Sequence, residues 1–263
     1  MDREAVLSRL DRERRSSFPG DAEGEVLPEL TRVRGREPEW HCIEFSRLDS
    51  ANAERVIAEQ VAHYRALRAE LEWKVYSQDT PSDLRERLER QGFRAGARES
   101  VLVLELSQPP VWLSERPRHR VLRVTRREQL RLFASVAEQG SARGRAAVAA
   151  ALLRHMERGS TEQLGYVAFD GDVPAAIGRL ETRATSAFGG LYGGLTLEAH
   201  RGRGLYHALI AERARDALRL GARYLRVDAL PTSEGILERL GFVKLADTWP
   251  YVLPRSDAPA GGG

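Results

Sequence analysis

The run Arg-Gly-Arg-Gly at residues 201–204 constrains the fold of this chain most, because of the elements predicted on either side of it. The preceding residues 191–197 have the pattern of a strand. An apolar stripe at helical spacing follows, made of Tyr206, Ile210, Ala214, Ala217 and Leu218. The first amide groups of a helix have no partner inside it and point outward, so a glycine turn at this place can hold an anion. The pattern predicts a diphosphate-binding turn, with two glycines for close approach of the backbone and two arginines as cations.

Other phosphate-binding motifs do not fit this turn. The chain contains no Gly-x-x-x-x-Gly-Lys-Ser/Thr, which excludes a nucleoside triphosphate loop. A third glycine of the dinucleotide-binding fingerprint is missing as well, because Leu205, Tyr206 and His207 follow directly. This motif alone does not distinguish a diphosphate-binding turn from an ordinary connection between a strand and a helix.

The residues after the helix narrow the interpretation. Residues 223–229 predict a second strand, and Pro231-Thr232-Ser233 is a helix-start signal. A short helix over 234–240 ends at Gly241, a C-cap glycine, and a last pair of strands is expected around Val243 and 249–253.

This order of elements, with two motifs in it, resembles the GNAT superfamily of N-acetyltransferases. The main family signature, Arg/Gln-x-x-Gly-x-Gly/Ala, is met by Arg201 and Gly204, with Tyr206 in the small-residue place. The second signature, a helix that ends in Leu-Gly-Phe, is met by residues 240–242. The resemblance covers residues 119–253. It implies an α/β (α+β) fold with a mixed, mostly antiparallel sheet flanked by helices.

The resemblance also implies acetyl-CoA as co-substrate. In this family the strand before the turn and the following strand splay apart, and the pantetheine arm pairs with the exposed backbone between them. Carried over to this sequence, the coenzyme-binding residues are expected to be Gly194, Leu195, Thr196, Leu197, Arg201, Gly202, Arg203, Gly204, Leu205, Tyr206, His207 and Ser233.

The catalytic groups of the family do not carry over. Some members place a carboxylate on the strand before the turn, where this chain has Phe188, and many place a tyrosine in the last helix, where it has Leu237. Tyr192, Glu181 and Tyr251 are weak substitutes, and an ordinary packed or surface role is the alternative for each. The mechanism expected is direct attack of an amine on the thioester, with its proton taken by a base or by water.

The N-terminal half repeats the same order of elements. A helix over 51–71, a strand at 73–76 and a short helix over 83–90 that ends in Gln-Gly-Phe precede an apolar strand at 101–106. The turn before the first of these helices, residues 46–52, has no glycine and carries Asp49, which would repel a phosphate. We therefore expect a degenerate GNAT-like half that does not bind coenzyme A; chance similarity between two α/β units is the alternative.

The expected organisation has five parts. Residues 1–39 predict a helix and an irregular segment; a partial GNAT-like domain, a Pro-marked linker, the acetyltransferase domain and a disordered tail follow, at 40–106, 107–118, 119–253 and 254–263. Within the fourth part, helices over 128–139 and 142–158 are expected to form the acceptor side of the cleft.

Composition limits the remaining classes of function. A nucleic-acid-binding protein is one alternative function, but the formal net charge of only +3 argues against it. One cysteine, Cys42, excludes an intramolecular disulfide, and no His/Cys/Asp/Glu cluster has metal-ligand spacing. No apolar run reaches the ~20 residues of a membrane span, and the N-terminus lacks a signal-peptide core.

We therefore expect a cytoplasmic enzyme whose partners are acetyl-CoA and an amine of a small molecule or protein, without nucleic acid or membrane. A homodimer is left open. The competing class is a coenzyme A-binding sensor or assembly module without turnover, which the missing family catalytic groups favour.

Overall fold

The computed structural model describes residues 1–18, 22–36, 39–140 and 145–255. Most of the predicted tail and the start of the helix predicted over 142–158 lie outside these ranges. The chain divides into two compact units, which are described separately. Unit 1 comprises Met1–Leu102, Asp228–Ile236 and Lys244–Gly263, and unit 2 comprises Val103–Val227 and Leu237–Val243. The boundaries predicted at residues 40, 106 and 118 stay predictions.

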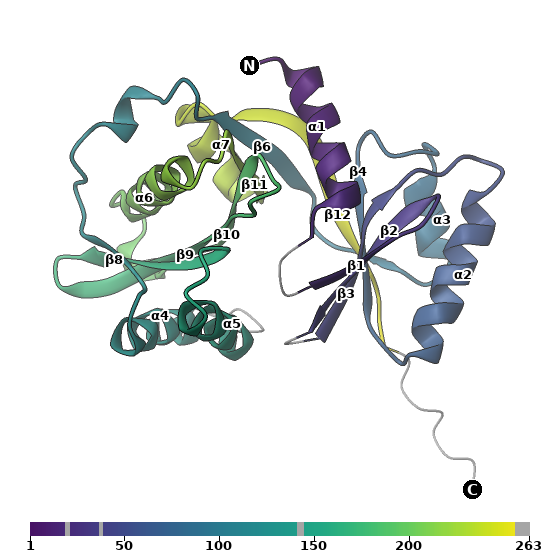
Figure 1. The fold of residues 1–263 in the computed structure, drawn as a ribbon, viewed down its shortest axis with the longest axis horizontal. Coiled ribbons are helices and arrows are strands. Elements are labelled where there is room, and N and C mark those ends of the chain that lie inside the picture. Colours follow the sequence, from purple (N-terminus) through teal and green to yellow (C-terminus); the bar gives the residue numbers. More distant parts are fainter. Residues whose placement is uncertain (19–21, 37–38, 141–144, 256–263) are drawn as a thin grey trace, which may run out of the picture. The chain divides into compact units, whose positions relative to one another are not determined.

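Unit 2 is built on a mostly antiparallel sheet (Figure 1). Its strands are β7 (Val121–Arg123), β8 (Gln163–Asp170), β9 (Val173–Glu181), β10 (Phe188–Thr196) and β11 (Tyr224–Ala229). The first four are antiparallel neighbours in this order, and β11 lies parallel to β10. A parallel neighbour requires a crossover, which α6 (Leu205–Arg219) provides.

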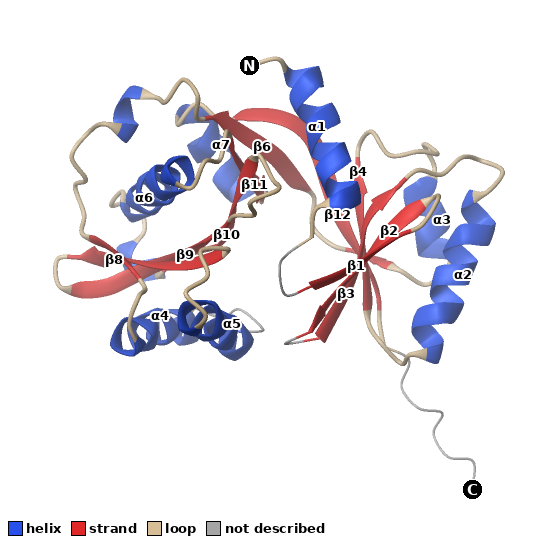
Figure 2. Cartoon of the chain, in the orientation of Figure 1, coloured by secondary structure: helices blue, strands red, loops and turns tan. Residues whose placement is uncertain are grey.

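Helices cover both faces of this sheet (Figure 2). On one face lies α6: a Cβ on Gly189 would lie 3.2 Å from Cβ of Ala217. On the other face, α4 (Arg127–Gln139) and α5 (Arg145–Glu157) cover a core that includes Phe133, Leu152 and Val167. Since side chains alternate along a strand, the residues next to Gly189 on β10 point toward the α4 and α5 face.

Unit 1 has the same plan. Its elements are α1 (Arg3–Ser16), β1 (Ala22–Val26), β2 (Leu30–Arg36), β3 (Glu39–Ser46), α2 (Ala53–Ala66), β4 (Leu71–Tyr76), α3 (Leu84–Arg90), β5 (Arg94–Ala95) and β12 (Val243–Leu253). The strands β1, β2 and β3 are antiparallel, β4 is parallel to β3, and β12 pairs antiparallel with β4 and β5. The chain passes between the units within β6 (Glu99–Glu105), β11 and α7 (Pro231–Arg239) and at the start of β12.

The internal repeat predicted from the sequence is therefore present. The run β3–α2–β4–α3 in unit 1 repeats β10–α6–β11–α7, and both short helices are followed by a glycine with positive φ, Gly92 at +95° and Gly241 at +89°. The predicted fold class, mostly antiparallel sheet flanked by helices in two related halves, is confirmed.

Two local expectations were wrong. Residues 22–26 and 30–36, expected to be irregular, form the hairpin β1–β2, because pairing with β3 and burial of Leu30 and Val33 outweigh their polar composition. The last pair of strands is one continuous strand, β12.

The predicted linker is attached to α6 rather than loose. Its 3-10 turn η1 (Val111–Leu113) places the Trp112 indole, which donates to the Leu240 carbonyl at 3.0 Å. From α6, Arg215 donates to the carbonyls of Leu113 and Glu115 at 3.1 and 3.0 Å. These bonds fix the segment that leads from β6 to β7.

Trp112→Ala should therefore lower the free energy of unfolding by about 2 kcal/mol, since it removes one hydrogen bond and the ring contact with His207. The neighbouring Val111→Ala is the control, because Val111 is 79% exposed, and its change should stay within about 0.5 kcal/mol. Urea denaturation compares the two; equal effects would mean that the segment is not anchored.

Candidate functional site

The predicted diphosphate turn lies in unit 2 between β10 and α6. A 3-10 turn, η2 (Glu198–His200), leads into it, and Gly204, with φ of +89°, is the N-cap of α6. The first bond of the helix is donated by Ala208 N to Gly204 O at 3.0 Å, so the amide groups ahead of it have no acceptor inside the helix. Gly202 has φ of +76°, and apart from its two neighbours no described residue comes within 4 Å of its Cβ position. The helix N-terminus is therefore open to an anion.

An acidic side chain organises the cations around this turn. The carboxylate oxygen Oδ2 of Asp170, at the β8–β9 hairpin, accepts from His200 Nδ1 at 2.8 Å and from Arg203 Nη1 at 2.7 Å. The hydrogen bond from His200 and the charge of Arg203 lower the pKa of Asp170. Among the described residues, the Arg201 side chain forms a hydrogen bond only with the Thr196 carbonyl, at 3.4 Å from Nε. Of the two arginines, Arg201 is thus the one without a carboxylate partner in the described chain.

Sequence reasoning missed one residue at the turn. His119, just before β7, places its ring nitrogen Nε2 at 2.7 Å from the Arg203 carbonyl. Nothing in its local sequence distinguishes it, because the contact spans 84 residues.

Beside the turn, β10 and β11 part. Their parallel ladder covers only the pairs from Phe188↔Tyr224 to Gly190↔Arg226. On its other edge β10 then carries a β-bulge between Tyr192 and Leu195, where Gly193 has φ of +58°. From the resemblance, we expected β10 to separate from its neighbour in this region and its backbone to pair there with the pantetheine arm.

Several predicted coenzyme-binding residues have side chains that serve packing. Leu205 is buried, and the Leu195 and Leu197 side chains pack against the core beneath α4. The Tyr206 ring lies 3.0 Å from a Cβ position on Gly194 and so supports the bulge. What these positions can offer a ligand is therefore their backbone.

Two of the three weak catalytic candidates lie together on the α4 and α5 face of the sheet. The Tyr192 ring lies over Gly190, whose Cβ would be 2.4 Å from Tyr192 Cε2, and Gly190 is the register partner of Glu181. Arg179, which the sequence analysis did not single out, links them. Its Nη1 donates to Glu181 Oε1 at 3.1 Å, and its guanidinium carbon lies 5.9 Å from the Tyr192 ring centroid.

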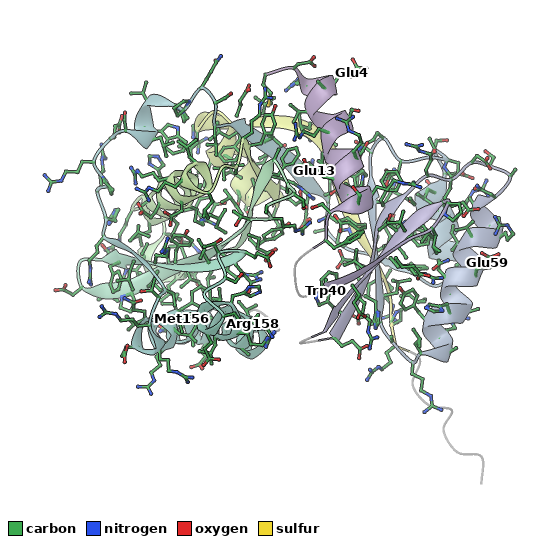
Figure 3. All side chains as sticks on the ribbon, in the orientation of Figure 1. Glu4, Glu13, Trp40, Glu59, Met156 and Arg158 are labelled. Carbon is green, nitrogen blue, oxygen red and sulfur yellow. The ribbon has the colours of Figure 1, made fainter. Side chains whose placement is uncertain are left out.

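Gln163 connects this cluster to a small pocket at the end of α5. It donates to the same Glu181 oxygen at 3.1 Å and lines a cavity of about 180 Å³. Met156, near the end of α5 (Figure 3), is another lining residue. Tyr192, Glu181 and Arg179 do not line the cavity, so the contact through Gln163 is its link to them.

The family's catalytic positions hold groups that cannot transfer a proton. The Phe188 ring is buried and stacks on Tyr224, with ring centroids 5.2 Å apart and an interplanar angle of 29°. Leu237 is fully buried in α7.

The remaining predicted residues lie elsewhere. Tyr251 belongs to the core of unit 1; its hydroxyl donates to Glu89 at 3.2 Å, and burial raises its pKa to about 12. Ser233 is the third residue of α7, and its amide donates to the Leu230 carbonyl. In the first turn of α6, His207 packs edge-on against Trp112, and burial lowers its pKa.

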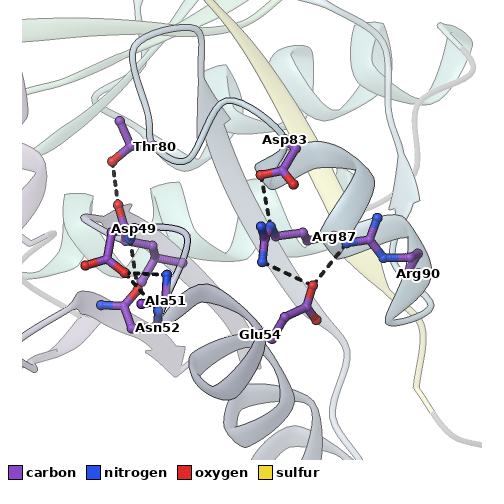
Figure 4. Close-up of polar contacts among 9 residues, drawn as sticks. Asp49, Ala51, Asn52, Glu54, Thr80, Asp83, Arg87 and Arg90 are labelled. Atoms are coloured by element: carbon purple, nitrogen blue, oxygen red, sulfur yellow. Dashed lines mark hydrogen bonds and ion pairs between the residues drawn. The ribbon is translucent and has the colours of Figure 1, made fainter.

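The corresponding turn of unit 1 is occupied by the chain itself (Figure 4). There the carboxylate of Asp49 accepts from the amides of Ala51 and Asn52, both at 2.8 Å, ahead of α2. Asp49 thus puts a negative charge into the turn that leads into α2 and binds two of its amides from within the chain.

The parting of strands in unit 1 is also filled from within. The ladder between β3 and β4 covers only Cys42↔Glu72 and Ile43↔Trp73. At the next residue, the Glu44 carbonyl accepts from Arg14 Nε at 3.0 Å, and the guanidinium of Arg14 lies 3.4 Å from the Tyr76 ring centroid. In unit 1, therefore, side chains of the chain itself contact both the turn ahead of α2 and the backbone next to the β3–β4 ladder.

Metal-ligand clusters and membrane-spanning helices are both absent from the described ranges. Within them, no three His, Cys, Asp or Glu side chains are grouped to hold a metal ion. Among the helices described, none is long and apolar enough to cross a membrane.

Comparison with solved structures identifies the fold. A GCN5-related N-acetyltransferase from Kribbella flavida has a TM-score of 0.65 and 17% identity, covering 97% of this chain and 95% of that one. A tandem GNAT protein from the clavulanic acid biosynthesis pathway has a TM-score of 0.62 and 11% identity, covering 92% and 86%. A GCN5-related N-acetyltransferase from Sphaerobacter thermophilus has a TM-score of 0.58 and 16% identity, covering 97% and 87%. No protein-family model and no curated protein matches the sequence.

At these identities the likeness establishes the fold: this chain has the GNAT fold, with two GNAT-like halves. The resemblance derived from the two motifs is thereby confirmed at the level of the fold.

The contacts of Arg14 give a stability prediction for unit 1. Burial raises the pKa of Asp79 to about 6, against the influence of Arg14, whose Nη2 lies 3.7 Å from the Asp79 carboxylate. Arg14→Met should lower the free energy of unfolding by about 3–5 kcal/mol at pH 7.5, since it leaves a buried carboxylate without its cation. A folded pKa above the unfolded value means that stability falls as pH rises from about 4 through 6, and without Arg14 this window should extend higher. The loss should therefore be smaller at pH 5.

Arg9→Met is the matched control on the same helix, because Arg9 is 44% exposed and pairs only with Glu13 among the described residues. Its cost should be below about 1 kcal/mol at either pH. Denaturant melts of both variants decide the matter, and a pH-independent loss for Arg14→Met would contradict the role given to Asp79.

Proposed function

We propose that this chain is an acetyl-CoA-dependent N-acetyltransferase that acts on an amine of a small molecule or protein. The observation that carries the proposal is the juxtaposition in unit 2 of an open helix N-terminus at Gly202 and Gly204 with the parting of β10 from β11. A diphosphate and an extended amide-bearing arm are the two parts of coenzyme A that these features fit.

Each part of the coenzyme has a proposed partner. The turn 201–204 and the first amides of α6, from Leu205 to His207, would hold the diphosphate, with Arg201 as the nearest available cation. The backbone from Gly194 to Leu197 would pair with the pantetheine arm, and Ser233 is retained from the resemblance as a further contact. In unit 1, the turn ahead of α2 carries the Asp49 carboxylate and Arg14 bonds the backbone next to the β3–β4 ladder, so one coenzyme per chain is expected.

The chemistry follows from these positions. The neutral amine attacks the thioester carbon, the C–N bond forms, and the C–S bond breaks with its electron pair leaving on sulfur. The amine loses a proton and the thiolate gains one. The backbone at the bulge is the proposed group for the carbonyl oxygen. Since Phe188 and Leu237 carry no acid or base, water is the proposed carrier of the proton.

Those two apolar residues also favour the second candidate, a coenzyme A-binding module without turnover. Consumption of acetyl-CoA across a panel of amines supports the enzyme, whereas tight coenzyme binding with no consumption supports the module.

Gly204→Glu should weaken coenzyme A binding at least tenfold, about 1.4 kcal/mol, because it puts a carboxylate at the amides proposed for the diphosphate. Gly221→Glu is a matched control: Gly221 follows the other end of α6 with φ of +85°, and apart from its neighbours nothing in the described part of the chain lies within 4 Å of its Cβ position. Calorimetry should show one site per chain in the wild type and an unchanged affinity for Gly221→Glu. Equal affinities of the two folded variants, or two sites per chain, would refute the cofactor assignment.

If water carries the proton, kcat/KM should rise with pH toward the pKa of the acceptor amine, without the inflection near about 6.5 that a histidine base would give. Tyr192→Phe and Glu181→Gln should each cost less than about tenfold in kcat. A loss of about a thousandfold at either position would identify a dedicated catalytic residue there.

A further inference from the structure

Arg179 presents an unused pair of donors at the bulge of β10. A Cβ on Gly193 would lie 3.4 Å from Arg179 Nε and 3.9 Å from its Nη2, so this edge of the guanidinium faces the bulge. The side chain is 18% exposed, and in the described ranges only Nη1 of the guanidinium forms a hydrogen bond, with Glu181. Two parallel N–H groups are therefore available beside Gly193.

The surroundings fix this orientation. Glu181 holds Nη1 at 3.1 Å, and Gln163 donates to the same carboxylate oxygen, so that the carboxylate itself is held from two sides. The Tyr192 ring lies near the guanidinium and covers Gly190. Glycine at position 193, with φ of +58°, leaves the donor edge uncovered by a side chain of β10. An arginine anchored through one nitrogen, with its other edge uncovered, is arranged for recognition rather than for packing.

The matching ligand group is planar and anionic. The Nε and Nη2 donors of an arginine fit the two oxygens of a carboxylate in a bidentate contact. Arg179 lies on the face that α4 and α5 cover, the side expected for the acceptor, because it follows Ile177 of that core by two residues on β9. We propose that Arg179 binds a carboxylate of the acceptor, so that the substrate is an amine of the amino-acid type. This inference rests on the proposed function and specifies its substrate class.

A binding experiment tests the recognition without an acceptor. S-carboxymethyl-coenzyme A carries a carboxylate in place of the acetyl group, and S-carbamoylmethyl-coenzyme A is its neutral isostere. Calorimetry on the full chain should show roughly tenfold or more tighter binding of the carboxylate analogue, as expected for a charge-assisted contact. Arg179→Gln should abolish this preference while coenzyme A itself binds unchanged, and Arg179→Lys should keep part of it. Arg219→Gln, a 65% exposed arginine at the end of α6, should leave it intact.

Equal affinity of the wild type for the two analogues would overturn the inference and leave the proposed function standing. Failure to bind any of these coenzymes would overturn both, which distinguishes the two failures.

A kinetic experiment then tests the substrate class. Amino acids are compared with their carboxamides and with the decarboxylated amines at fixed acetyl-CoA. The amino acids should be favoured at least tenfold in kcat/KM. Arg179→Gln should raise KM for the amino acids and leave KM for the carboxamides and the decarboxylated amines nearly unchanged. If Arg179→Gln instead lowers kcat equally for all three, the guanidinium acts on the thioester oxygen and the assignment of the substrate class is wrong.

Discussion

The early end of a parallel ladder is the constraint on which the rest of this structure depends. In unit 2, β10 and β11 pair over three residues and then part, and in unit 1, β3 and β4 pair over two. Backbone donors and acceptors that lose a strand neighbour need other partners, because an unpaired buried amide or carbonyl costs more than a typical hydrogen bond contributes. The backbone of each half therefore needs other hydrogen-bond partners at the point where its strands separate.

Unit 1 supplies its own side chains. Arg14 crosses from α1 to the Glu44 carbonyl, and Asp49 accepts from the amides of Ala51 and Asn52 in the turn ahead of α2. The Asp49 carboxylate accepts from backbone amides, as a phosphate would. The Arg14 guanidinium donates to a backbone carbonyl, as the amide group of an extended ligand would. In unit 1 these positions are filled by contacts within the chain, whereas unit 2 keeps an open turn whose arginine Arg201 has no carboxylate partner in the described chain.

Much of the fold could be predicted from the sequence, and the reasons are local. The helices over 51–71, 83–90 and 128–139 and the strands around them have strong periodicity and Pro or Gly boundaries, so their existence was predictable and only their ends moved. The hairpin β1–β2 was missed because its polar residues gain strand structure from pairing with β3, which no local pattern reveals. Of the site, the turn could be predicted because glycine and arginine spacing encodes it. Arg179 and His119 could not, since each contributes through contacts that form only when distant segments meet.

The arginines show what the structure adds to the amino-acid composition. Of the 41 basic residues only Lys74 and Lys244 are lysines, and the acidic residues interleaved with the arginines argue against an arginine-driven phosphate surface. In the structure, individual arginines have distinct environments. Arg213, 1% exposed in α6, donates to the carbonyls of Leu209 and Arg179, and burial lowers its pKa to about 10. A Cβ on Gly178 would lie 2.8 Å from its guanidinium, so the glycine on β9 makes room for it beneath the sheet. On the opposite face of the same strand, the next residue, Arg179, extends toward the bulge. Two successive positions of β9 thus face two different guanidinium groups: Gly178 makes room for the buried group of Arg213, and Arg179 extends a partly exposed group from the other face. The alternation of the strand therefore separates an arginine that supports the sheet from one that we propose for a ligand.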